Sequence, residues 1–329
     1  MKICFLSQST TMRRGSYRIH VHDLCHYINK YTDTNASINP GNINSYDVII
    51  LDKSFCNNDK ILNSLCGKFS NKILGVITPS AVPNKWWDKI NFTIVGSCEE
   101  KDSLLKYCKH NFIFPQIELK YLNSIPKVHT DKKEIIIGYH GNVNHLNHMN
   151  LGLCKAIERL AKEIPLKLHI VTNTNLQDWI QGRPKVETVI KQWDIDKVDK
   201  DIQLMDIGIV PNISHYNKEL MDMNIVLGKY NTDLVVRFKN KSNIGRSLVF
   251  FQLGIPVVAD ITPSNMHMFA DPDNGYAVLS EEGWYLAMKD LVDYKRRNFI
   301  SQNAFKEYKE KYNPSKWSNL LVKNLKKLL

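Results

Sequence analysis

Short apolar runs alternate with amphipathic segments along most of the 329-residue chain. Lys2–Leu6, Tyr46–Leu51 and Ile73–Thr78 are rich in aliphatic and β-branched residues and have the length of buried strands. Between such runs, segments such as Tyr17–Ile28 place apolar residues at helical spacing. Strands that alternate with helices in this way predict parallel sheets in an α/β fold.

The alternation of strand-like and helical segments is interrupted once and then resumes. Strand-like runs continue to Asn111–Phe114, and a polar, proline-started segment then predicts a linker over 126–133. A new strand follows at Glu134–Tyr139. We therefore predict two doubly wound domains, 1–125 and 134–300, and C-terminal helices over 301–329 that can cross back to the first domain.

Each predicted domain opens with a strand, a polar loop and a helix. The first loop contains Arg14, Gly15 and Ser16, and the second contains Gly141 and Asn142. In a doubly wound domain such loops lie at the carboxyl ends of strands, where ligands bind. The first loop therefore either contacts a ligand or is an exposed turn.

The stretch from Arg237 to Asp260 has the most informative pattern. Four cations lie within ten residues, then a short apolar helix ends at Gly254, and a β-branched strand follows. A helix N-terminus attracts anions because its first N–H groups lack partners. The sequence favours a phosphate-bearing ligand here, against the alternative of a solvated basic turn. The polar residues concerned are Arg237, Lys239, Lys241, Ser242, Asn243 and Arg246.

Composition narrows the classes of protein. The net charge of +11 suits nucleic acid, an anionic membrane or a phosphorylated ligand. No zinc finger or RNP-like aromatic pair accompanies the charge, so we expect no nucleic-acid partner. The seven cysteines include no C-x-x-C pair, and the N-terminus lacks the pattern of a signal peptide. These features predict a cytoplasmic protein with reduced thiols.

The last segment, 299–329, is helical in pattern and is interrupted at Asn313-Pro314. Its final part has an apolar side and a side with several lysines. We expect it to pack on the body of the protein. The alternative is peripheral contact of a basic amphipathic helix with the inner face of a membrane.

Four motifs resemble those of GT-B glycosyltransferases, most closely the family 4-like, group 1 type. They are I-I-I-G-Y-H-G-N-V-N at 135–144, M-D-I-G-I-V-P at 205–211, K-S-N through R at 241–246 with L-G-I-P-V-V at 253–258, and D-N-G-Y at 273–276. The resemblance implies two Rossmann-like domains that face a central cleft. It also implies transfer of a sugar, of hexosyltransferase type, from a nucleotide-sugar to a glycan, lipid or protein acceptor.

The resemblance also implies roles for single residues. Arg237, Lys241 and Arg246 would stabilise the diphosphate leaving group, with Ser242 and Asn243 as further donors. Gly141 and Asn142 would approach from the facing loop, Pro211 and Asn212 would border the nucleotide, and Arg14, Gly15 and Ser16 would lie on the acceptor side. Since cations of the protein would stabilise the diphosphate, we expect no metal and no cofactor. Val249 stands where many retaining members have a glutamate, so no ribose contact is carried over.

Two other functions remain open at this point. One is a nucleotide-sugar epimerase of the same shape, which needs acidic and histidine side chains that converge in the second half. The sequence shows no such cluster. The other is a non-catalytic protein that binds sugar-nucleotides or nucleic acid. The sequence selects neither a catalytic base nor a stereochemical outcome.

Overall fold

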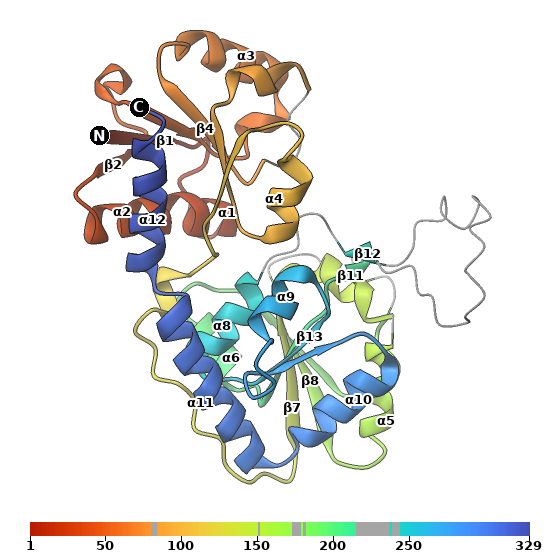
Figure 1. Cartoon of the computed structure of the whole chain (residues 1–329). Coiled ribbons are helices and arrows are strands. Elements are labelled where there is room, and N and C mark those ends of the chain that lie inside the picture. The colour runs from red at the N-terminus through yellow and green to blue at the C-terminus, as the bar shows by residue number, and fades with distance from the viewer. Residues whose placement is uncertain (80–83, 151, 173–178, 180–181, 215–236, 239–243) are drawn as a thin grey trace, which may run out of the picture. The chain divides into compact units, whose positions relative to one another are not determined.

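The computed structural model describes residues 1–79, 84–150, 152–172, 179, 182–214, 237–238 and 244–329 (Figure 1). The chain divides into two compact units. Unit 1 comprises 1–124, 243–252 and 306–329, and unit 2 comprises 125–242 and 253–305. Residues 243–252 thus group with unit 1, within the span that the sequence pattern assigns to the second domain.

Unit 1 contains a parallel sheet of six described strands in the order β2-β1-β3-β4-β5-β6. The first strand lies between the second and third, so the connections run in opposite directions from β1. This reversal creates a switch point between β1 and β3, where ligands bind in open α/β sheets. The strands are β1 (Lys2–Leu6), β2 (Asn35–Ile38), β3 (Val48–Leu51), β4 (Ile73–Ile77), β5 (Phe92–Val95) and β6 (His110–Ile113).

The helices of unit 1 begin where the sequence supplies capping side chains. Asn58 accepts hydrogen bonds from the N–H groups of Lys60 and Ile61, and Ser97 accepts one from Glu100. The helical segments are α1 (Gly15–Tyr17), the π-helix η1 (Arg18–Asp23), α2 (Leu24–Tyr31), α3 (Asp59–Lys68), α4 (Cys98–Leu104), most of α8 (Gly245–Leu253) and α12 (Pro314–Lys326), with 3-10 turns η2 (Ile43–Ser45), η3 (Phe55–Asn57), η4 (Asn84–Lys89) and η5 (Leu119–Tyr121).

Unit 2 contains a second parallel sheet of six described strands, in the order β14-β13-β10-β7-β8-β9. Here the connections reverse at β7, which places the switch point between β7 and β10. The strands are β7 (Ile135–His140), β8 (Leu166–Thr172), β9 (Thr188–Gln192), β10 (Ile207–Val210), β13 (Val257–Asp260) and β14 (Tyr276–Val278). A separate antiparallel pair joins β11 (Ile213–Ser214) to β12 (Arg237–Phe238).

The helices of unit 2 bury an apolar stripe against this sheet. In α5, Leu153, Ile157 and Leu160 recur at helical spacing and are fully or almost fully buried with the strand residues of the core. The helical segments are η6 (Val143–Asn150, 3-10), α5 (Leu153–Leu160), α6 (Val198–Gln203), α9 (Pro263–Met268), α10 (Glu281–Asp290) and α11 (Tyr294–Lys311), whose last residues belong to unit 1.

Most of the predicted elements are confirmed, including the break at Asn313, whose side chain caps α12 ahead of Pro314. Gly254 ends α8 with φ +69°, as its position predicts. The sequence pattern missed β2, α6 and α9. These elements are short and rich in polar residues, and so they lack a clear apolar period.

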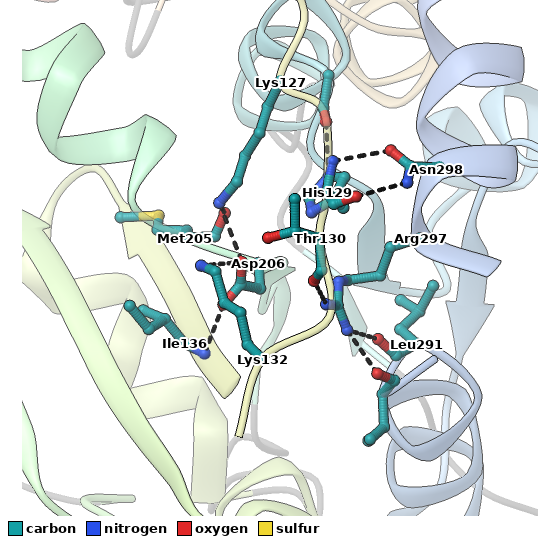
Figure 2. A network of polar contacts seen from close by, with 12 residues as sticks. Lys127, His129, Thr130, Lys132, Ile136, Met205, Asp206, Leu291, Arg297 and Asn298 are labelled. Atoms are coloured by element: carbon teal, nitrogen blue, oxygen red, sulfur yellow. Dashed lines mark hydrogen bonds and ion pairs between the residues drawn. The ribbon is translucent and has the colours of Figure 1, made fainter. Parts of the chain in front are cut away.

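The predicted linker is bound to unit 2 by a buried polar network (Figure 2). The carboxylate of Asp206 is fully buried and accepts hydrogen bonds from Lys127 Nζ at 3.0 Å, Lys132 Nζ at 2.8 Å and the Ile136 N–H at 3.0 Å. Burial by itself raises the pKa of Asp206. The two lysines and the backbone bond outweigh burial, and the pKa stays below its usual value.

The opposite side of this segment is held by α11 (Figure 2). His129 and Asn298 exchange two hydrogen bonds, of 2.8 and 2.7 Å. Arg297 is fully buried and donates to the carbonyls of Leu291 at 2.8 Å and Thr130 at 3.1 Å. Since Asp206, Asn298 and Arg297 all hold the segment, it is an ordered part of unit 2.

We expect Asp206→Asn to lower the free energy of unfolding by about 3 kcal/mol, because it leaves Lys127 buried without its counter-ion. Lys132→Ala should lower the free energy of unfolding by less than about 1 kcal/mol, since this lysine is partly exposed and Lys127 remains.

The pH dependence of stability gives a second test. A carboxyl group whose pKa is depressed in the folded state contributes stability above its unfolded-state pKa, and this stability is lost as the pH falls through the folded-state pKa. Denaturant titrations from pH 7 to 3 should therefore show a flatter acid limb in Asp206→Asn, and equal limbs would contradict this.

Candidate functional site

The predicted donor-side residues follow two neighbouring strands of unit 2. Gly141 and Asn142 come directly after β7, and Pro211 and Asn212 come directly after β10. These strands are parallel and paired, so their carboxyl ends lie at one edge of the sheet, on the two sides of the switch point. The structure therefore brings these four residues together.

The loop after β7 turns sharply at Gly141, which has φ +132°, a conformation that favours glycine. Its N–H donates to the carbonyl of Val171 at 3.0 Å. Asn142 Oδ1 accepts from the N–H of Asn144 at 2.9 Å, and the hydroxyl of Tyr139 donates to the Asn142 carbonyl at 2.7 Å. The loop thus has a fixed backbone path, with Asn142 exposed at its tip.

The loop after β10 is held by the neighbouring strand. The N–H of Asn212 donates to the buried carboxylate of Asp260 at 2.6 Å. Asp260 ends β13, and its carbonyl accepts from Asn265 Nδ2 at 2.8 Å. The sequence does not predict the roles of Asp260 and Asn265, because a carboxylate at the end of a strand gives no local sign of its partner 48 residues away.

Arg237 reaches the same edge through the antiparallel pair. It lies opposite Ser214 in register, and β11 follows Asn212 without a break. Lys241, Ser242 and Asn243, like Lys239, lie outside the described residues. Arg246 is half-buried in the first turn of α8, within unit 1.

The predicted acceptor-side residues lie at the switch point of unit 1. Arg14 is exposed and precedes α1, and Gly15 and Ser16 form its first turn. Across the switch point, the Ser7 hydroxyl donates a hydrogen bond to the Asp52 carboxylate, and this bond connects the ends of β1 and β3. Asn39 Nδ2 donates to the Ser7 carbonyl at 2.9 Å, which adds the end of β2.

A further pair of residues, which the sequence does not predict, lies at this edge. His20 lies in the π-helix η1, and its Nδ1 is 3.1 Å from the Thr78 hydroxyl at the end of β4. Thr78 has φ +44°, an unfavourable conformation for a β-branched residue. Burial, with Lys53 and Arg18 nearby, lowers the pKa of His20 to about 3. The imidazole is therefore neutral at pH 7. A π-helix and strained backbone in contact are typical of functional sites.

Among the described residues, no group of three or more His, Cys, Asp or Glu side chains could hold a metal ion. The same part of the chain contains no helix that is both long and apolar enough to cross a membrane.

No protein-family model matches the chain, and no curated protein matches it. Solved structures, in contrast, do match the chain. Sucrose-phosphate synthase from Thermosynechococcus elongatus aligns over 99% of this chain and 98% of its own, at 11% identity and a TM-score of 0.66. Anabaena HepE, in complex with UDP and glucose, aligns over 99% of this chain and 100% of its own, at 13% identity and a TM-score of 0.62.

A third structure, TarM, aligns over 84% of this chain and 54% of its own, at 14% identity and a TM-score of 0.58. At such identities the likeness shows the fold. The chain has the GT-B fold, with two Rossmann-like α/β domains. This part of the expectation from the sequence motifs is confirmed, whereas the family 4-like assignment stays a prediction.

We expect Thr78→Gly to be more stable than Thr78→Ala by about 1 kcal/mol, because both lose the contact with His20 but only glycine removes the left-handed strain. Urea titrations of both variants would measure the difference. At an ordinary position alanine is the more stable of the two, so that order would contradict strain at Thr78.

Proposed function

We propose that this protein is a glycosyltransferase that moves a sugar from a nucleotide-sugar to an acceptor. The observation that carries the proposal is the full-length GT-B likeness to enzymes such as sucrose-phosphate synthase and to HepE with UDP and glucose bound. Polar loops at the switch point of each sheet support it, because such points are where α/β sheets bind nucleotides and sugars.

In this proposal the donor binds at the carboxyl edge of the unit 2 sheet. Gly141 lacks a side chain, so the backbone can come close to the ligand. Pro211 and Asn212, on the other side of the switch point, border the nucleotide. The hydrogen bond from Asn212 to Asp260 holds this border in place.

The chemistry centres on the leaving group. Negative charge grows on the nucleoside diphosphate as the glycosidic bond breaks, and preorganised cations lower the energy of that state. We assign this role to Arg237, Lys241 and Arg246, with Ser242 and Asn243 as hydrogen-bond donors. A cation about 4 Å from the phosphate contributes on the order of 4 kcal/mol at an effective dielectric near 20, before desolvation. In this proposal the reaction needs no metal.

We place the acceptor at the carboxyl edge of unit 1, near Arg14, Gly15 and Ser16. His20 and Thr78 lie at the same edge and supply a neutral imidazole and a hydroxyl, which suit hydrogen bonds to a sugar hydroxyl.

Calorimetry with UDP, GDP and single-stranded DNA tests the proposal. We expect micromolar binding of one nucleoside diphosphate, and Arg246→Ala should weaken it by about 10- to 100-fold, since a charged hydrogen bond contributes about 1.5–3 kcal/mol. Arg246→Lys should retain part of the affinity, because it keeps the charge but not the bidentate geometry.

The matched control is Arg183→Ala, which removes an exposed arginine from the loop ahead of β9, at the amino edge of the sheet. It should bind like the wild type. Tight DNA binding with no affinity for any nucleotide would contradict the proposal. If one nucleoside diphosphate binds, a thermal-shift screen of sugar-nucleotides identifies the base and sugar of the donor.

A further inference from the structure

A groove lies along the edge strand of the unit 1 sheet. It has a volume of about 510 Å³, within the range of pockets that hold small molecules. One wall is the edge strand β6 with the end of α4, and the other is α12. Its lining includes Leu105, Phe112, Trp317, Leu320, Lys101 and Lys109.

The apolar part of this groove is open to solvent. Leu105 is 56% exposed and Leu320 is 45% exposed, on opposite walls. An apolar ligand in this concave surface would remove both leucines from water, which is favourable.

Two polar side chains of the lining, Asn111 and Trp317, form hydrogen bonds within the protein. Asn111 accepts from the Thr93 hydroxyl at 2.6 Å and donates to the Cys108 carbonyl at 2.6 Å. The indole N–H of Trp317 donates to the Lys311 carbonyl at 2.8 Å. The exposed leucines and Phe112 leave an apolar surface beside these two side chains, which suits an apolar chain.

The charge at the rim defines the other end of the ligand. Lys101 and Lys109 are exposed beside the apolar lining, and α12 carries lysines but no acidic residue. Asp102 is the neighbouring exposed carboxylate on α4, and the carboxylate of Glu100 is turned inward to the N–H of Gly96. An apolar slot with a cationic rim is complementary to an acyl chain with an anionic headgroup.

We propose that this groove binds an acyl chain of an anionic phospholipid and so attaches unit 1 to an anionic membrane surface. The leucines and Trp317 contact the chain, and Lys101 and Lys109 bind the headgroup phosphate. The proposal does not depend on the proposed transferase activity, since the groove shares no residue with either switch point.

Co-sedimentation of the full chain with vesicles tests this site. We expect binding to vesicles of phosphatidylglycerol and phosphatidylcholine, and at least tenfold weaker binding to phosphatidylcholine alone. Leu105→Ser/Leu320→Ser and Lys101→Glu/Lys109→Glu should each weaken binding to the anionic vesicles at least tenfold. All four positions are exposed, so thermal unfolding should match that of the wild type.

The matched controls are Leu286→Ser and Lys295→Glu, which change an equally exposed leucine (54%) and an exposed lysine of unit 2. They should bind vesicles like the wild type. Equal losses in control and groove variants would show that the net charge alone drives binding and would overturn the proposal. Binding of an acidic apolar peptide without any vesicle binding would also overturn it. Nucleotide binding measured in the same variants keeps this result separate from the transferase hypothesis.

Discussion

The geometry of unit 2 depends on the hydrogen bonds that the buried carboxylate of Asp206 accepts. It stands immediately before β10 and accepts the N–H of Ile136 at the start of β7. Lys127 and Lys132, from the segment before β7, also donate hydrogen bonds to it. An unpaired buried charge is expensive, so these partners must come together whenever the unit folds. The register of β7 against β10 is thereby fixed at the amino edge.

That register decides the candidate site at the other edge of the same strands. Because β7 and β10 are parallel, fixing their starts also fixes where they end, and Gly141 and Pro211 come to lie on the two sides of the switch point. Unit 1 uses hydrogen bonds directly at its carboxyl edge, where Asp52, Ser7 and Asn39 connect three strand ends. In both units a polar network determines where the loops at the carboxyl edge begin.

The switch points and the groove beside α12 differ in the chemistry of their surfaces. The switch points present backbone groups and neutral polar side chains, which suit a sugar-nucleotide and its acceptor in the proposed reaction. The groove beside α12 presents leucines with a lysine rim, which suits an amphiphile. In the two proposals, part of the net charge of +11 binds phosphate groups of small ligands or lipids.

The sequence by itself determined the alternation of strands and helices, the restart near Glu134, the helix end at Gly254 and the break at Asn313, because apolar period, capping and glycine conformation are local properties. It also placed Gly141, Asn142, Pro211 and Asn212 after strands. Only the tertiary structure decided the strand order and the partners of buried polar groups. Lys127 meets Asp206 across 79 residues, and Thr78 meets His20 across 58. Such contacts leave no periodic signal in a single sequence, because each depends on which strands become neighbours after folding.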